Sequence, residues 1–285
     1  MKVFCILGDE RVRYSKSPGL HSKIMKQYGI EAIYVPFPVT SDQLGQVSSG
    51  LKALNIAGAN VTVPYKEKII PYLDEVSEAA REIGAVNTIV RSGDRLIGDN
   101  TDFGGFMDCL RDLQWAPGKA TVLVVGTGGV AKAILHALKK LKVKRILVSG
   151  RSLDKVHEVS KRFGAEAYSW DSLCGHTLDH SGDSYDKLEE IAVDLLINAT
   201  SVSSCAESPT LRDDLQRLRI KRCKHVFDVN YGRSENLWME WAQKVGATSI
   251  DGLSMLANQA QRSFLLWTGL DVEKNEFRRI LESFH

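Results

Sequence analysis

The sequence lacks paired cysteines and long apolar segments. Its five cysteines are far apart and form no CxxC pair; they are Cys5, Cys109, Cys174, Cys205 and Cys223. This spacing offers no zinc site and is typical of reduced thiols in the cell interior. No apolar run is long enough to span a bilayer, and the run at residues 3–7 is too short for a signal peptide. We therefore expect a cytoplasmic protein that binds neither a metal nor a membrane.

An excess of charge of one sign is also missing. The 285 residues include 37 Lys and Arg and 35 Asp and Glu, a formal net charge of +2. Basic residues cluster only briefly, at residues 139–145 and 217–224, as at helix ends and solvated surfaces. We therefore expect no nucleic-acid partner. The length allows two domains, and 44% hydrophobic residues are typical of a globular protein.

One segment, residues 174–190, lacks any regular pattern and is rich in Gly, Ser, Asp and His. His176 and His180 have the i, i+4 spacing of some metal-binding pairs. No third ligand is near them in the sequence and the surrounding pattern is not helical, so we interpret the segment as a surface excursion.

The rest of the chain alternates between strand and helix patterns. Strands are predicted at residues 3–7, 34–39, 58–63, 121–125, 145–149, 195–199 and 225–230, with a β-hairpin at 85–91 and 95–98. Helices are predicted at residues 18–28, 41–54, 74–83, 101–113, 235–245, 255–268 and 272–284. This alternation predicts an α/β fold with mostly parallel sheets.

The most informative segment is a glycine-rich loop between a strand and a helix pattern. Residues 121–125 form an unbroken run rich in β-branched residues, typical of a parallel strand buried on both faces. Gly126, Gly128 and Gly129 allow a tight turn and the close approach of a phosphate, and a helix beginning near Val130 adds the positive end of its dipole. The segment predicts a nucleotide site. The alternative is a tight strand-to-helix turn without a ligand.

The strand that follows this helix indicates which dinucleotide the site binds. In dinucleotide-binding folds this strand ends beside the adenosine ribose, and an NAD site places Asp or Glu there. Here the strand is followed by Arg151 and Ser152, with Lys155 one turn later, while Asp154 falls inside the next helix. Guanidinium and ammonium groups suit a 2′-phosphate, so we predict NADP rather than NAD. The alternative is a solvated helix start with incidental basic residues.

Four polar clusters precede the glycine loop, at residues 14–18, 60–66, 84–88 and 98–102. Ser15 and Ser17 are two residues apart on an extended segment, so they point the same way and could together bind a carboxylate; alternatively, Ser17 only caps its helix. Asn60, Thr62 and Pro64 are expected on one face of a strand. Each cluster could be a set of turn residues, but together they offer the donors, acceptors and acid–base couple that a polyhydroxylated substrate needs.

Taken in order, these motifs resemble the shikimate dehydrogenase (shikimate/quinate dehydrogenase) family along nearly the whole chain. The matching segments are SKSP (15–18), NVTVPYK (60–66), GAVNT (84–88), NTD (100–102), GTGG (126–129), NATS (198–201), MLANQ (255–259) and FLLWTG (264–269). The resemblance implies reversible NADPH-dependent reduction of 3-dehydroshikimate to shikimate, on the route to aromatic amino acids. It also implies a substrate domain formed by residues 1–103 and 253–285 and a Rossmann-like NADP domain formed by residues 104–252.

The resemblance further implies roles for individual residues. Those that would bind the substrate are Ser15 and Ser17 with Tyr231 near its carboxylate, and Thr62, Asn87 and Gln259 at its ring hydroxyls. Lys66 and Asp102 would be the catalytic pair. Those that would contact NADP are Gly126, Gly128, Gly129, Val130, Ala131, Arg151, Ser152, Lys155, Thr200, Ser201, Gly252 and Met255.

The chemistry of the catalytic pair can be argued from the residues themselves. Hydride transfer to a ketone forms an alkoxide, which must gain a proton, and an ammonium beside the oxygen stabilises the charge and supplies that proton. A carboxylate at Asp102 would keep Lys66 charged and oriented, because opposite charges favour each other's ionised forms. Which of the two holds the proton at the transition state stays open.

The sequence departs from the family pattern at four places. It has Gly150-Arg151-Ser152 where Asn-Arg-Thr is common, Ser203-Ser204 where Gly-Met is usual, Gly232-Arg233 where Asn-Pro is usual, and Tyr14 where His is common. A quinate dehydrogenase using NAD or both cofactors is therefore an alternative. A non-catalytic, metabolite-binding relative is a further one, against which the presence of both Lys66 and Asp102 argues. The sequence does not decide between a monomer and a homodimer.

Overall fold

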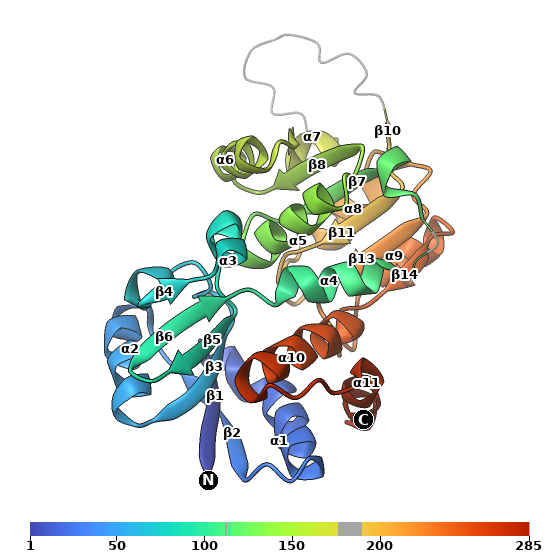
Figure 1. Cartoon of the computed structure of the whole chain (residues 1–285). Helices are drawn as coiled ribbons and strands as arrows, with labels where there is room; N and C mark the ends of the chain where they lie inside the picture. Colours follow the sequence, from blue (N-terminus) through green and yellow to red (C-terminus); the bar gives the residue numbers. More distant parts are fainter. Residues whose placement is uncertain (112, 114, 176–189, 285) are drawn as a thin grey trace. The chain divides into compact units, whose positions relative to one another are not determined.

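The computed structural model describes residues 1–111, 113, 115–175 and 190–284 (Figure 1). The chain divides into two compact units, one formed by Met1–Asp112 with Ser254–His285 and the other by Leu113–Leu253. His176, His180 and most of the polar segment at 174–190 lie outside the described residues.

The first unit joins both ends of the chain. Its strands are β1 (Lys2–Gly8), β2 (Ala32–Pro38), β3 (Ile56–Val61), β4 (Glu75–Val76), β5 (Thr88–Ser92) and β6 (Arg95–Asp99). Its helices are α1 (Ser17–Gln27), α2 (Leu44–Ala53), α3 (Glu78–Ile83), α4 (Asp102–Arg111), α10 (Leu253–Thr268) and α11 (Lys274–Glu282), with short 3-10 turns such as η1 (Glu10–Tyr14).

The sheet of this unit is mixed. Its described strands have the order β2-β1-β3-β5-β6-β4. The pairs of β1 with β2 and β3 are parallel, whereas β5 is antiparallel to both β3 and β6. The inner strands carry apolar side chains into a buried core that includes Leu7, Ala59 and Ile89. Polar residues that follow β3 and β6 are thereby held on a rigid frame.

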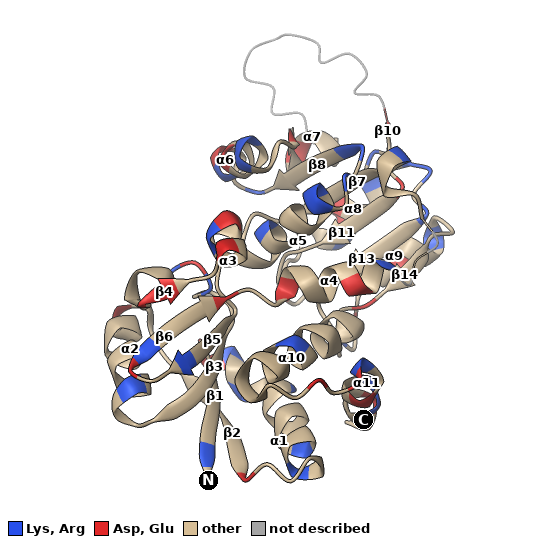
Figure 2. Ribbon diagram, viewed as in Figure 1, with Lys and Arg blue, Asp and Glu red and all other residues tan. Residues whose placement is uncertain are grey.

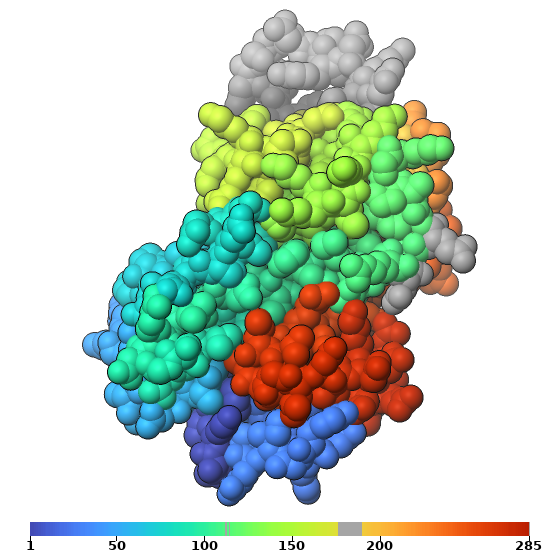
Figure 3. Space-filling view, viewed as in Figure 1, coloured from blue at the N-terminus to red at the C-terminus, as the bar shows by residue number. Residues whose placement is uncertain are grey.

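The two ends of the chain pack together in the first unit. Figure 3 shows the C-terminal residues, in red, directly against the N-terminal residues, in blue. The hydroxyl of Tyr28 donates to Glu276 on α11 at 2.8 Å, and the ring of His21 on α1 lies 6.3 Å from that of Phe277. The C-terminal helices therefore complete the core of the first unit.

The second unit is made of alternating strands and helices. Its strands are β7 (Thr121–Val125), β8 (Arg145–Gly150), β9 (Glu166–Ser169), β10 (Ile191–Ala192), β11 (Leu195–Asn198), β12 (Ile220–Lys221), β13 (His225–Asp228) and β14 (Thr248–Ile250). Its helices are α5 (Gly129–Lys140), α6 (Leu153–Phe163), α7 (Trp170–Leu173), α8 (Leu211–Arg217) and α9 (Leu237–Lys244).

The main sheet of the second unit is parallel throughout its described strands, in the order β14-β13-β11-β7-β8-β9. Numbered along the sheet's own strands, this order reads 6-5-4-1-2-3, which is the arrangement of dinucleotide-binding folds. The order reverses between β7 and β11. In such sheets ligands bind beyond the carboxyl ends of the strands at this switch point.

The predicted α/β class with mostly parallel strands is confirmed, but several boundaries differ. The helix predicted at 74–83 begins only at Glu78, where Ser77 caps it by accepting from the N–H of Ala80 at 3.1 Å. The residues before it form β4, because the backbone N–H of Leu96 donates a hydrogen bond to the carboxylate of Asp74 at 2.6 Å. The strand predicted at 58–63 ends at Val61. Strands β9 and β14 were not predicted.

No helix among the described residues has the length and apolar character needed to cross a membrane. Along the ribbon, Lys and Arg positions are interspersed with Asp and Glu positions in the elements of both units (Figure 2).

Candidate active site

Lys66 and Asp102 form a buried ion pair in the first unit. The Nζ of Lys66 lies 2.7 Å from Oδ2 of Asp102, and the two residues are 9% and 5% exposed. Lys66 lies beyond β3, where its carbonyl accepts from the N–H of Val86 at 2.7 Å. Asp102 is the first residue of α4, and Asn100 accepts from its N–H at 3.1 Å. Both charged groups are therefore carried by short, hydrogen-bonded segments.

Asn87 connects this ion pair to neighbouring polar groups. Its Nδ2 donates to Oδ1 of Asp102 at 2.9 Å, while its Oδ1 accepts from the N–H of Thr101 at 2.7 Å. Because a backbone N–H can only donate, the second contact fixes which end of the amide faces Asp102. One carboxylate oxygen of Asp102 therefore pairs with the ammonium of Lys66, and the other accepts from the amide of Asn87.

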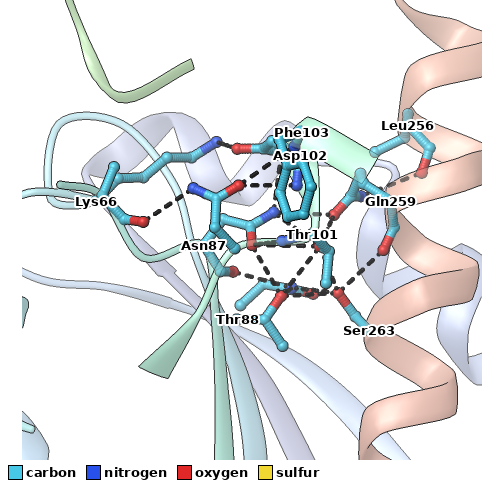
Figure 4. A network of polar contacts seen from close by, with 12 residues as sticks. Lys66, Asn87, Thr88, Thr101, Asp102, Phe103, Leu256, Gln259 and Ser263 are labelled. Carbon is cyan, nitrogen blue, oxygen red and sulfur yellow. Dashed lines mark hydrogen bonds and ion pairs between the residues drawn. The ribbon is translucent and has the colours of Figure 1, made fainter. Parts of the chain in front are cut away.

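Gln259 enters the same site from α10, as Figure 4 shows. Its Oε1 lies 3.4 Å from both Nδ2 of Asn87 and Oγ1 of Thr101, and its Nε2 donates to the carbonyl of Leu256 at 3.1 Å. The two contacts at Oε1 are long for hydrogen bonds. They can be exchanged for a ligand hydroxyl at little cost.

The three remaining predicted substrate residues of the first unit are close to strand ends or helix starts. Ser17 is buried as the first residue of α1, and its N–H donates to Oγ of half-buried Ser15 at 3.2 Å. The structure therefore places Ser17 inside the helix, and the predicted N-cap role is wrong. Thr62 follows β3 directly and is half-buried, with its N–H donating to the carbonyl of Leu7 at 2.8 Å. Pro64 is not on the strand.

In the second unit, the glycine loop follows β7 as predicted. Gly126 has φ of +127°, and a Cβ there would lie 2.8 Å from the carbonyl oxygen of Ala199 at the switch point. A Cβ on Gly128 would meet nothing within 4 Å. The protein's own packing therefore requires the first glycine but not the second, whose open surroundings leave room for a phosphate. Helix α5 begins at Gly129, with Val130 half-buried and Ala131 fully buried.

The basic residues predicted for a 2′-phosphate lie at the tip of β8. Arg151 and Ser152 follow the strand, Lys155 is in the first turn of α6, and all three side chains are exposed. A Cβ on Gly150 would lie 3.6 Å from the methyl group of Thr127, so this tip adjoins the glycine loop. The residues present thus fit a phosphorylated dinucleotide.

A second buried carboxylate lies behind the loop that follows β11. Asp228, at the end of β13, accepts from Oγ of Ser203 at 2.7 Å and from Nδ2 of Asn198 at 2.9 Å. Asn198 in turn accepts from the hydroxyl and the N–H of Thr200, at 2.7 and 3.1 Å. Burial raises the pKa of Asp228, and hydrogen bonds from Ser203, Asn230 and Asn236 oppose that effect. Thr200, a predicted cofactor residue, is therefore fixed through Asn198, and Ser201, the next predicted cofactor residue, is exposed.

The last predicted residues lie on either side of the unit boundary. A Cβ on Gly252 would clash with the carbonyl of Val229, so close backbone packing requires glycine there. Tyr231 is half-buried in the second unit, and Met255 is buried on α10 in the first. Among the described residues, no group of three or more His, Cys, Asp or Glu is arranged to hold a metal.

Comparisons with known proteins agree with this geometry. Residues 6–89 match the family described as the shikimate dehydrogenase substrate binding domain, and residues 113–204 match shikimate / quinate 5-dehydrogenase. The chain is 38% identical over 277 residues to a shikimate dehydrogenase (NADP(+)) of Caldanaerobacter subterraneus, covering 96% of this chain and 94% of the relative. The protein belongs to the shikimate dehydrogenase family.

Other members of the shikimate dehydrogenase family support the same assignment. A shikimate dehydrogenase (NADP(+)) of Pyrococcus furiosus is 38% identical over 281 residues, 98% of this chain and 94% of that relative. The solved Aquifex aeolicus shikimate dehydrogenase has a TM-score of 0.83 at 29% identity, covering 99% and 97% of the two chains. The Thermus thermophilus enzyme, solved with NADP(H) and shikimate, has a TM-score of 0.81 at 27% identity and covers 99% of each chain.

Two departures from the shikimate dehydrogenase pattern are joined in the structure. Glu207 accepts from the N–H of Ser203 at 2.7 Å and the hydroxyl of Ser204 at 3.2 Å. Its other carboxylate oxygen lies 2.6 Å from the guanidinium of Arg233. The Ser203-Ser204 and Gly232-Arg233 changes therefore form one connected set of contacts. Tyr14, another of the four departures, is exposed.

Sequence reasoning missed two buried residues that contribute to these sites, Ser263 and Asp228. Ser263 lies four positions after Gln259, a spacing that puts both on one face of a helix. That spacing was a usable signal for Ser263. Asp228 had a weaker one, a carboxylate directly after an apolar strand.

Proposed function

We propose that this protein catalyses the reversible, NADP-dependent interconversion of 3-dehydroshikimate and shikimate, in the biosynthesis of aromatic amino acids. The observation that carries the proposal is the Lys66–Asp102 ion pair, buried beside the amides of Asn87 and Gln259. A positive, proton-bearing group among neutral donors and acceptors is the arrangement that reduction of a ketone on a hydroxylated ring requires. The 38% identical relatives named shikimate dehydrogenase (NADP(+)) support it.

In this mechanism Lys66 moves the proton and Asp102 holds Lys66 in place. NADPH, when bound, supplies the hydride that reduces the ring carbonyl carbon. The C=O π bond breaks as hydride arrives, and the Nζ of Lys66 donates a proton to the oxygen, which becomes the hydroxyl of shikimate. Lys66 is then neutral and takes a proton from solvent. In the oxidation direction, neutral Lys66 accepts the hydroxyl proton.

The remaining residues of the first unit would bind and orient the substrate. Ser15 and Ser17, at the start of α1, would hold the carboxylate, a position that the helix dipole favours for an anion. Thr62, Asn87 and Gln259 would bind the ring hydroxyls. We assign Tyr231 to the carboxylate end on the family resemblance.

We assign NADP binding to residues 104–252 and substrate binding to residues 1–103 and 253–285. Gly126, Gly128, Gly129, Val130 and Ala131 would surround the pyrophosphate. Arg151, Ser152 and Lys155 would bind the 2′-phosphate, because Arg and Lys at a strand tip replace the carboxylate that an NAD site carries there. The residues assigned to the nicotinamide side are Thr200, Ser201, Gly252 and Met255.

We further propose that the protein acts in the cytoplasm, as a monomer or a homodimer. Light scattering at assay concentrations measures the mass directly, against 31.6 kDa for one chain. A mass of three or more chains would contradict this assignment.

The function is tested by following the absorbance of reduced nicotinamide with shikimate or quinate as substrate and NADP or NAD as cofactor. We expect the highest kcat/KM for shikimate with NADP. A higher kcat/KM for quinate, or for NAD, would assign the protein to the quinate-oxidising side of the family. No turnover of either substrate would overturn the proposed function.

A further inference from the structure

Ser263 is a buried serine to which the proposed mechanism gives no role. It lies on α10, is 0% exposed, and follows Gln259 by four residues. A buried hydroxyl is costly unless it is hydrogen-bonded, and serine is a weaker helix former than alanine. The contacts of Ser263 therefore indicate why a hydroxyl is present.

The hydroxyl of Ser263 joins α10 to three other segments of the first unit. Its Oγ lies 2.8 Å from Oγ1 of Thr88 on β5 and 3.1 Å from Oγ1 of Thr101, just before α4. It also accepts from Nδ2 of Asn60 on β3 at 3.2 Å. Figure 4 shows Thr88, Thr101 and Ser263 together beneath Asn87. We call Thr88, Thr101 and Ser263 the hydroxyl cluster.

The direction of hydrogen bonding at Asn60 sets the role of Ser263 in this cluster. Nδ2 of Asn60 donates to the backbone carbonyl of Asn87 at 3.1 Å, and a carbonyl can only accept, so Nδ2 is the end that faces the cluster while Oδ1 accepts from the hydroxyl of Tyr34 at 2.7 Å. Ser263 therefore accepts from Asn60, and its one proton can go either to the backbone carbonyl of Gln259, 3.1 Å away, or to the hydroxyl of Thr88, 2.8 Å away. Thr88 can then use its proton to donate to Oδ1 of Asn87, 3.0 Å away.

The hydroxyl cluster therefore holds the side-chain oxygen of Asn87. Oδ1 of Asn87 lies 3.0 Å from the hydroxyl of Thr88 and 3.2 Å from that of Thr101. The Nδ2 end is left for Asp102 and Gln259. The carbonyl of Gln259 also lies 3.1 Å from Oγ of Ser263. That carbonyl belongs to the backbone of Gln259, and the side-chain amide of Gln259 meets the cluster only through Thr101, whose Oγ1 lies 3.4 Å from its Oε1.

We propose that Ser263 is a positioning residue for substrate binding, which acts through Thr88 and Thr101 to hold the amide of Asn87 in the orientation that recognises a ring hydroxyl. The inference rests on the proposed function. Ser263 would act on the affinity for the hydroxylated ring and not on the cofactor, because its contacts are all with the first unit.

The test compares Ser263→Ala with Thr268→Val on the same helix. Thr268 makes the same type of bond to the carbonyl four residues earlier, Phe264, at 2.7 Å, without contacting the hydroxyl cluster. We expect Ser263→Ala to raise the KM for shikimate roughly fivefold to tenfold, as the loss of about one hydrogen bond implies. The KM for NADP and the value of kcat should change less than about twofold by the same argument, and Thr268→Val should match the wild type.

Each outcome separates the inference from the proposed function. If the wild-type protein does not oxidise shikimate, the proposed function fails. If the wild type is active but Ser263→Ala keeps its KM for shikimate, or raises both KM values equally, the positioning role is overturned. Should Ser263→Ala fail to fold, Ser263→Cys, which keeps a weak donor in a similar volume, is measured instead. Its KM for shikimate should lie above that of the wild type, and an unchanged value would count against the role.

Discussion

Asp102 in the first unit and Asp228 in the second are buried carboxylates that are held by different kinds of donor. Asp102 is 5% exposed and accepts from the ammonium of Lys66 and the amide of Asn87. Asp228 is 0% exposed and accepts from Ser203, Asn198, Asn230 and Asn236, whose donors are uncharged. An ammonium can deliver its proton to a substrate, whereas the hydroxyl and amide donors stay fixed. We therefore infer that Asp102 takes part in the chemistry through Lys66, whereas Asp228 stabilises the loop that follows β11.

The largest effect should come from the charged pair. Lys66→Ala removes the group that donates the proton, so we expect kcat to fall by roughly 10²–10⁴-fold. The dissociation constant for NADP, measured by fluorescence titration, should stay nearly unchanged. Lys68→Ala is the matched control, because Lys68 is exposed and its Nζ bonds to Ser41 at 3.2 Å. Near-full activity in Lys66→Ala would remove this residue from the mechanism.

Asp228→Ala should act on stability rather than on chemistry. It leaves the donors of Ser203, Asn198 and Asn236 buried without their acceptor, so we expect the free energy of unfolding to fall by about 2–4 kcal/mol. Urea denaturation measures this loss. Asp213→Ala, at an exposed position on α8, should leave the urea midpoint unchanged. Equal midpoints for Asp228→Ala and the wild type would show that the loop does not depend on Asp228.

The contrast between the two carboxylates also marks what the sequence could predict. Lys66 and Asp102 lie in local motifs, and the glycine loop after β7 is a continuous pattern, so both sites were predicted. The environment of Asp228 was not, because its donors Ser203 and Asn236 are 25 and 8 residues away. A serine inside a helix, such as Ser263, looks like a surface residue until its partners on other strands are known.

The fold shows the same limit of prediction from local sequence. Four parallel strands of the second unit, β7, β8, β11 and β13, were predicted because each is a short, largely apolar run, whereas the more polar β9 and β14 were not. The start of α3 was predicted wrongly because Asp74 bonds to the backbone of Leu96, 22 residues later, and this contact makes a strand of residues that would otherwise suit a helix. Contacts between distant segments decided the boundaries that local pattern could not.

A smaller effect is expected at the tip of β8. Arg151→Ala removes a charged fork proposed for the 2′-phosphate, so the KM for NADP should rise about tenfold, while the KM for NAD stays the same. The comparison with NAD supplies the internal control, and Lys161→Ala, near the other end of α6, supplies the matched variant. Parallel changes in both KM values would mean that Arg151 does not select the cofactor.

The smallest effect concerns His21, another buried titratable group of the first unit. In the described chain both ring nitrogens lack hydrogen-bond partners, and burial lowers the pKa of His21 from 6.5 to about 3. Between these values the unfolded chain takes up a proton that the folded protein does not, so the stability present above pH 6.5 is lost progressively as the pH falls toward 3.

His21→Phe should remove this contribution. Between pH 6.5 and 5.5 the wild type should lose about 1 kcal/mol more unfolding free energy than the variant. Urea denaturation at both pH values measures the difference. Identical losses in the two proteins would contradict the buried, neutral state of His21.

The central claim is that the ammonium of Lys66 takes part in the chemical step itself. Stopped-flow absorbance of a single turnover, with enzyme in excess over shikimate and NADP saturating, isolates that step from product release. The account predicts that Lys66→Ala slows the appearance of reduced nicotinamide by roughly 10²–10⁴-fold. A single-turnover rate equal to that of the wild type would contradict it.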